Sequence, residues 1–134
     1  MTERDVMDFD VVIVGGGPAG LSTAIHLANL IEAHNAEIEK KGEGEKLEPE
    51  ICLIDKAAEL GAHSLSGAVL DPKTLNELVP DWRSMEPPAP VEAEVHKDYV
   101  LWLSEKGGKK LPITPPPLKN HGNFVVSLNK MVGW

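Results

Sequence analysis

The chain has 134 residues, the usual length of a single domain. Its 13 Lys and Arg stand against 21 Asp and Glu, a formal net charge of −8, which argues against nucleic acid as a partner. Cys52 is the single cysteine, so no internal disulfide can form, which suits a reducing compartment. No apolar run approaches the length of a transmembrane helix, about 18 residues, and we expect no signal peptide.

The first element in chain order is a strand that leads into a glycine-rich turn, DVVIVGGGPAGLS over residues 10–22. Val11–Val14 is an unbroken apolar run that predicts a strand covered on both faces, as in a parallel sheet. Gly15, Gly17 and Gly20 follow with G-x-G-x-x-G spacing. This order of strand, glycine turn and helix is the context in which a dinucleotide pyrophosphate binds at a helix N-terminus.

Each glycine of the motif has a separate expected role. Gly15 permits the tight turn, Gly17 lets the backbone approach the phosphates, and Gly20 allows close packing of helix on strand. Pro18 suits the first helical turn, and the apolar spacing predicts a helix to about Ala33. The alternative is a glycine-rich turn in an unrelated α/β protein.

A second strand, Ile51–Ile54, ends at an acid, Asp55. In dinucleotide-binding proteins an acid at this point binds the ribose hydroxyls, which favours FAD or NAD over NADP. Asp55 lies 35 residues after Gly20 (55 − 20), whereas about 20 is usual. Residues 34–50, rich in Glu and Lys, explain the excess, and we interpret 37–50 as a charged surface excursion. The alternative for Asp55 is an ordinary strand-end acid.

A short helix is predicted after a small, glycine-rich loop at residues 59–68. Asp71 can cap this helix, Pro72 can begin it, and Pro80 ends it near Val79. Its apolar stripe consists of Leu75, Leu78, Val79 and Trp82. Spacing alone favours packing of this stripe on the domain's own core.

The remaining elements are shorter. We predict a strand over residues 97–103 and a turn at Gly107–Gly108. The hairpin partner of the strand is predicted over residues 110–113. Pro115–Pro117 predicts an extended segment, 124–128 another strand, and 129–134 the start of a helix. A doubly wound sheet needs more strands than these, so we expect a fragment of a larger two-domain flavoprotein.

The sequence offers no catalytic or metal-binding constellation. The five histidines share no metal-ligand spacing: His26, His34, His63, His96 and His121. No Ser-His-Asp or Cys-His arrangement is recognisable, so we predict no catalytic residue and no metal site. Cys52 is interpreted as a small buried apolar residue.

Several longer segments together resemble one family. VVIVGGGPAGLSTAI, CLIDKAAELGAHSLSGAVLDP, LNELVPDW and PPPLKNHGNFVVSLNKMVGW occur in this order and are similar to the N-terminal part of the electron transfer flavoprotein–ubiquinone oxidoreductase family. GAHSLSGAVLDP and KNHGNFVVSL are more specific than the glycine triad, because general dinucleotide-binding proteins lack them. Only 37–50 departs from the family pattern.

The resemblance implies an α/β, Rossmann-like FAD-binding domain of the glutathione-reductase type, incomplete and with a β-hairpin insertion. It implies a membrane-associated enzyme that passes electrons from reduced electron transfer flavoprotein to ubiquinone through FAD and one [4Fe-4S] cluster. Such enzymes are monotopic on the mitochondrial inner membrane or the bacterial cytoplasmic membrane. The cluster cysteines lie near the family's C-terminus, and this chain has none there.

The resemblance also assigns cofactor-binding residues. The positions matched to the pyrophosphate turn are Val14, Gly15, Gly16, Gly17, Pro18, Ala19 and Gly20. Asp55 takes the place of the family's usual Glu, Lys56 follows it, and Ser66 and Gly67 match the loop near the flavin. The segment Leu60–Asp81 corresponds to a family stretch at the lipid surface, which would reverse the interpretation of its apolar stripe.

The sequence is also compatible with two other kinds of protein. One is a related flavoprotein, FixC-like or geranylgeranyl-reductase-like. The other is a truncated, non-catalytic nucleotide-binding remnant that does not hold FAD stably.

Overall fold

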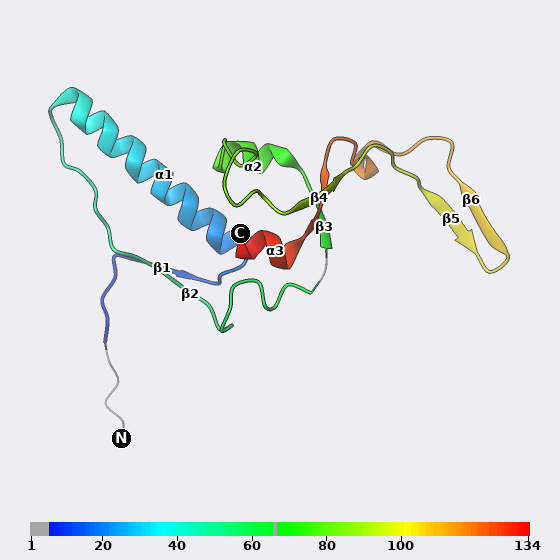
Figure 1. The fold of residues 1–134 in the computed structure, drawn as a ribbon, viewed down its shortest axis with the longest axis horizontal. Coiled ribbons are helices and arrows are strands. Elements are labelled where there is room, and N and C mark those ends of the chain that lie inside the picture. Colours follow the sequence, from blue (N-terminus) through cyan, green and yellow to red (C-terminus); the bar gives the residue numbers. More distant parts are fainter. Residues whose placement is uncertain (1–5, 66) are drawn as a thin grey trace, which may run out of the picture. The chain divides into compact units, whose positions relative to one another are not determined.

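The computed structural model describes residues 6–65 and 67–134, which fall into two compact units, Met1–Ser64 and Leu65–Trp134. Figure 1 traces the chain through both units. The first holds one βαβ arrangement, and the second holds a small antiparallel sheet, a hairpin and short helices. The mixed α/β character expected from the sequence is therefore confirmed.

The first unit consists of β1 (Val11–Val14), α1 (Pro18–Lys41) and β2 (Ile51–Ile54). The two strands are parallel and pair residue for residue, beginning with Val11 opposite Ile51. Parallel neighbours need a crossover connection, and α1 supplies it. The strand, glycine turn, helix and second strand expected from the sequence are all present.

The expectation that β1 is covered on both faces is wrong for the described residues. Val12 and Val14 are 50% and 79% exposed, whereas Val11 and Ile13 are half-buried. Successive side chains of a strand point to opposite faces, and Ile13 lies on the face that carries α1. In β1, therefore, only one face is covered.

Helix α1 is eight residues longer than expected, since it ends at Lys41 rather than near Ala33. Gly42 ends it in the left-handed conformation, with φ of 70°, and its N–H donates to the Ile38 carbonyl at 2.9 Å. The Lys41 ammonium pairs with Glu37 one turn earlier. Charged residues without apolar periodicity thus continue the helix, because local ion pairs and the C-cap support them.

The segment after α1 returns along the helix and is tied to it. The Asn35 side-chain amide donates to the Leu47 carbonyl and accepts from the Leu47 N–H, both at 2.8 Å. His34 Nε2 lies 3.2 Å from the Glu45 carbonyl oxygen. Residues 37–41 are therefore helical, and the rest of the 37–50 excursion is a tethered loop.

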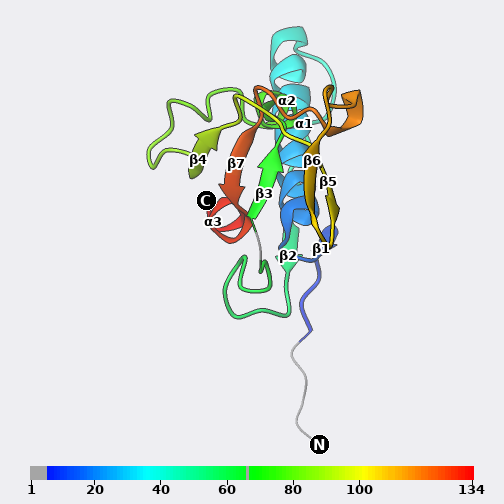
Figure 2. The same cartoon turned by 90° about the vertical axis from the view of Figure 1, so that its right-hand side faces the viewer.

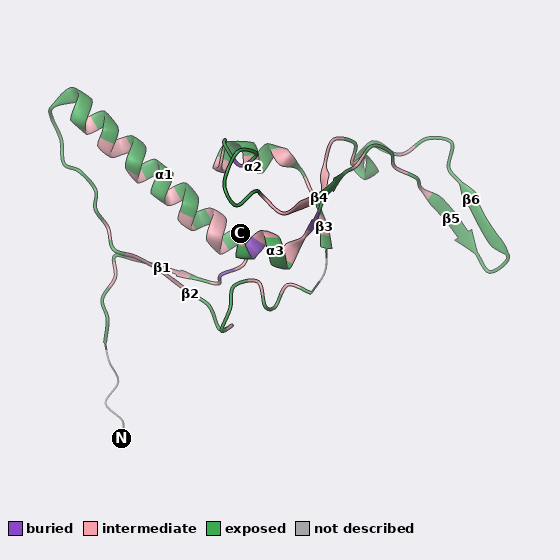
Figure 3. Cartoon of the chain, in the orientation of Figure 1, coloured by how far each residue is buried: buried purple, intermediate pink, exposed green. Residues whose placement is uncertain are grey.

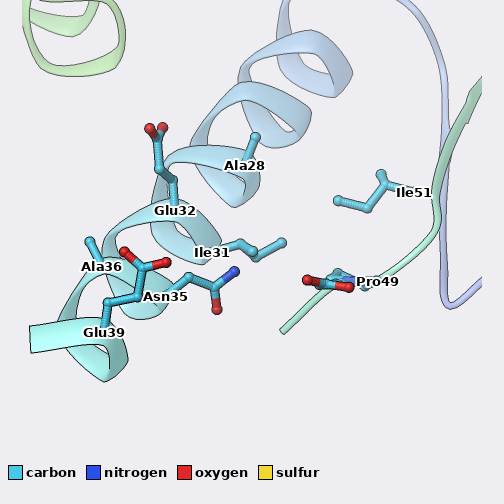
Figure 4. Close-up of a pocket in the computed structure, with 9 residues that line it drawn as sticks. Ala28, Ile31, Glu32, Asn35, Ala36, Glu39, Pro49 and Ile51 are labelled. Carbon is cyan, nitrogen blue, oxygen red and sulfur yellow. The ribbon is translucent and has the colours of Figure 1, made fainter. Parts of the chain in front are cut away.

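A groove of about 530 Å³ lies between α1 and the chain that enters β2 (Figure 4). It is lined by Ala28, Ile31, Glu32, Asn35, Ala36, Glu39, Glu48, Pro49 and Ile51.

The second unit is built on a three-stranded antiparallel sheet (Figure 2). The central strand is β7 (Phe124–Ser127), with β3 (Gly67–Leu70) on one side and β4 (Val91–Glu94) on the other. Strand β7 matches the expected strand. Strands β3 and β4 were not expected, because their sequences are short and the segments around them are rich in glycine or proline.

The core of the second unit is small. Trp82, Val126 and Val132 are 3%, 1% and 6% exposed, and they are the buried hydrophobic residues of the described chain (Figure 3). Trp82 meets the Phe124 ring edge-on, with 5.7 Å between ring centroids. Val132 comes from α3 (Leu128–Gly133), the helix expected at the end of the chain.

Helix α2 (Pro72–Leu78) agrees closely with the sequence. The Asp71 side chain accepts a hydrogen bond from the Lys73 N–H at 2.9 Å and caps the helix. Leu75, Leu78 and Val79 are half-buried, and Trp82 beyond them is buried. This stripe faces the unit's own interior rather than solvent.

The hairpin is confirmed, but its turn is displaced. Strand β5 (Leu101–Ser104) pairs with β6 (Gly107–Lys110), so the turn lies at residues 105–106 and both glycines belong to β6. Gly107 has φ of +146°, a conformation that suits glycine beside a two-residue turn. Pro116–Leu118 forms a 3-10 helix, η1, where an extended segment was expected.

Candidate functional site: the glycine turn between β1 and α1

The backbone of the glycine turn requires glycine at two positions. Gly15 has φ of +112°, and its N–H donates to the Ile54 carbonyl at 2.8 Å, which joins the turn to β2. A Cβ at Gly20 would lie only 1.8 Å from the Gly15 carbonyl oxygen. The first glycine therefore makes the turn, and the third lets α1 pass close to it, as the motif predicts.

Gly17 caps the N-terminus of α1, and Pro18 is its first residue. A Cβ at Gly17 would have no protein atom within 4 Å, so nothing in the first unit requires glycine there. The early N–H groups of a helix have no intrahelical partner and carry partial positive charge. The turn thus presents an unobstructed helix N-terminus suited to an anion.

Asp55 lies directly beside this turn. Its Oδ2 accepts a hydrogen bond from the Gly16 N–H at 2.6 Å, and its Oδ1 accepts from the Ala57 N–H at 2.7 Å. These bonds, that of Ala57 first, hold the pKa of the Asp55 carboxyl below its usual value, and the His63 and Lys56 charges lower this pKa further. The acid is therefore ionised at neutral pH and presents only acceptors.

The structure brings some of the predicted residues together and leaves others apart. Gly15 to Gly20 and Asp55 form one group in the first unit, with Val14 before the turn and Lys56 after the acid, both exposed. Gly67 lies in the second unit, where it pairs with Ser127 in the sheet. Ser66 lies outside the described residues.

Leu60 is a part of this site that the sequence did not indicate. A Cβ built on Gly16 would meet the Leu60 Cδ2 atom at 2.5 Å, so this leucine lies over the middle glycine of the turn. No sequence motif includes this leucine. Its position depends on how the loop folds back after Asp55.

The described residues contain no group of three or more His, Cys, Asp or Glu side chains that could hold a metal ion. An iron–sulfur cluster requires several cysteine thiolates, and Cys52 is the only cysteine of the chain. The residues present do not fit a [4Fe-4S] cluster. In the described part of the chain, no helix has both the length and the apolar character needed to cross a membrane.

Comparison with known proteins finds curated relatives that match nearly the whole chain. Over 98% of its length the chain is 45% identical to the electron transfer flavoprotein-ubiquinone oxidoreductases of Dictyostelium discoideum and Homo sapiens, and 47% identical to that of Rattus norvegicus. Each of these relatives is described as mitochondrial. No family model matches the chain.

The printed names of these relatives describe oxidoreductase enzymes. The resemblance noted in the sequence is confirmed, because the chain is similar over nearly its whole length to electron transfer flavoprotein–ubiquinone oxidoreductases. The chain spans about a fifth of the length of the relatives it matches, 19% to 20%.

Proposed function

We propose that the glycine turn and Asp55 bind the adenosine diphosphate half of FAD. The observation that carries this proposal is the ionised Asp55 carboxylate held beside an unobstructed helix N-terminus, with 2.6 Å between Oδ2 and the Gly16 nitrogen. The pyrophosphate would lie against Gly17 and the first N–H groups of α1. Free lone pairs of the carboxylate would accept from the ribose hydroxyls and would repel a 2′-phosphate.

We propose further that the chain serves an enzyme that transfers electrons from electron transfer flavoprotein to ubiquinone. The names of its relatives support this activity, while the matched segment is only about a fifth of their length. Bound FAD would supply the redox chemistry. The residues of this chain would bind and orient the adenosine end, without acting as general acid or base. A [4Fe-4S] cluster would require ligands from elsewhere.

The proposed site predicts a strong effect at Gly17. Gly17→Val places a branched side chain where the pyrophosphate would lie, and we expect ADP and FAD affinity to fall at least about a hundredfold. Apart from its chain neighbours, no described residue lies within 4 Å of the added Cβ, so we expect no more than the loss of about 1 kcal/mol that a poorer N-cap causes. Titration calorimetry with ADP measures the affinity, and flavin absorbance after desalting measures FAD retention.

Ala33→Val is the control, because Ala33 is exposed on the same helix and lies outside the glycine motif. Unchanged ADP affinity in Gly17→Val would contradict the site. A wild-type chain that binds ADP but loses FAD on desalting would favour the non-catalytic alternative.

A second proposal concerns the membrane surface. Helix α2, within the expected segment Leu60–Asp81, turns its apolar stripe inward. The β5–β6 hairpin instead exposes large apolar side chains: Leu101, Trp102 and Leu103 are 57% to 74% exposed, and Tyr99, just before β5, is 60% exposed. Lysines at 106, 109 and 110 lie on the same ribbon. Aromatic and aliphatic side chains beside lysines suit an anionic lipid interface, so we propose that the hairpin contacts it.

A further inference from the structure

Gly16 is the middle position of the G-x-G pair, which the motif leaves free. It is nevertheless the one described residue of the first unit that is buried. A Cβ there would lie 2.5 Å from the Leu60 Cδ2 atom and 3.3 Å from the Asp55 Cβ atom. At Gly17, by contrast, a Cβ would meet nothing within 4 Å. Of these two neighbouring glycines, packing within the first unit requires only Gly16.

The contacts on Gly16 come from one short segment. Asp55 ends β2 and accepts from the Gly16 N–H, and Leu60 follows five residues later and lies over the same glycine. The second carboxylate oxygen of Asp55 accepts from the Ala57 N–H, which fixes the start of this segment. The Asp55 side chain, directly after β2, thus holds the turn that follows β1.

We propose that Asp55 is a positioning residue for the glycine turn and that Leu60 completes its action by covering Gly16. This inference rests on the proposed nucleotide site and adds a second task for Asp55 there. Each carboxylate oxygen uses one lone pair on a backbone amide and keeps another for a ribose hydroxyl. Asp55 would therefore act on the nucleotide directly and also through the shape of the turn.

The proposal is tested first without nucleotide. In Asp55→Asn one oxygen becomes an amide donor, so either the Gly16 or the Ala57 N–H loses its acceptor. We expect hydrogen exchange at one of these two amides to accelerate by about tenfold or more, measured on the whole chain by NMR. A carboxylate that serves only the ribose would leave both exchange rates unchanged, and that result would overturn the proposal.

The second test is a rescue. Gly16→Ala should weaken ADP binding by about tenfold or more, because the added methyl pushes against Leu60 and displaces the turn. Leu60→Ala removes that obstacle, so the double variant should recover most of the lost affinity. The matched pair is Gly17→Ala, with and without Leu60→Ala. Gly17→Ala should weaken ADP binding with no recovery, since a Cβ at Gly17 would not meet Leu60.

The outcomes separate the two proposals. Absence of ADP binding by the wild-type chain would overturn the proposed nucleotide site, while altered amide exchange in Asp55→Asn would still support the positioning role. Binding by the wild type without rescue of Gly16→Ala would overturn the covering role of Leu60 and leave the nucleotide site intact. Thermal denaturation of each variant shows whether it folds. If a Gly16 variant does not fold, the single variant Leu60→Ala still shows whether hydrogen exchange at the Gly16 amide depends on the Leu60 side chain.

Discussion

Trp82 shows how much one residue contributes to this chain. Its ring is buried against the edge of Phe124, its Nε1–H donates to the Asn76 side chain at 2.9 Å, and the Arg83 guanidinium lies 4.0 Å from its ring centroid. Cation–π and edge-to-face contacts each add to the hydrophobic gain of burial. In a unit with a small core, this side chain joins α2, through Asn76, to β7, through Phe124.

Removal of that ring should be costly. We expect Trp82→Ala to lower the free energy of unfolding by about 3–5 kcal/mol, measured by urea denaturation. Trp102→Ala is the matched control, since Trp102 is 74% exposed, and its effect should stay within about 0.5 kcal/mol. Equal effects of the two substitutions would show that the packing around Trp82 does not stabilise the unit.

At the scale of elements, the length of α1 depends on its C-cap. The last helical residues are charged and exposed, so packing does not decide where the helix ends. The left-handed conformation of Gly42, with its N–H bonded to the Ile38 carbonyl, is the local stop signal.

This role predicts a modest, specific loss on substitution. Gly42→Ala places a Cβ in the left-handed region, and we expect the free energy of unfolding to fall by about 1 kcal/mol. Circular dichroism during urea titration gives the value. Glu43→Ala, one position further along the exposed loop, serves as control and should have little effect. A similar loss in both variants would contradict the assignment of the cap to Gly42.

At the scale of the whole molecule, buried side chains are few and exposed apolar ones are many. Among the described residues, the buried hydrophobic ones belong to the second unit, and Gly16 is the one buried residue of the first. Val12 and Val14 on β1 and Trp102 and Leu103 on the hairpin remain exposed. Contiguous exposed apolar surface is typical of regions that contact a membrane or another protein surface.

The hairpin proposal is tested with vesicles of phosphatidylcholine and phosphatidylglycerol. Trp102→Ser together with Leu103→Ser should reduce sedimentation of the chain with these vesicles by about tenfold, because each lost apolar side chain weakens insertion. Leu65→Ser tests the segment Leu60–Asp81 in the same assay, since Leu65 is 94% exposed. Loss of binding in Leu65→Ser alone would assign lipid contact to that segment instead.

The sequence by itself determined the parts of the molecule that depend on neighbouring residues. The strand, the glycine turn, the start of α1 and the strand that ends at Asp55 could be predicted, because periodicity, glycine spacing and capping are local signals. The cap at Asp71 and strand β7 could be predicted for the same reason. The family could be recognised because long, ordered segments are far more specific than a glycine triad.

Only the tertiary structure decided which distant segments meet. Strands β3 and β4 exist because they pair with β7, from which they are separated by tens of residues, and four-residue strands carry too little periodicity to be recognised alone. The same reason applies at the candidate site. The sequence indicated Asp55 as a partner for ribose, but the bond from Gly16 to its carboxylate and the cover of Leu60 arise only when the loop after β2 folds back onto the turn after β1.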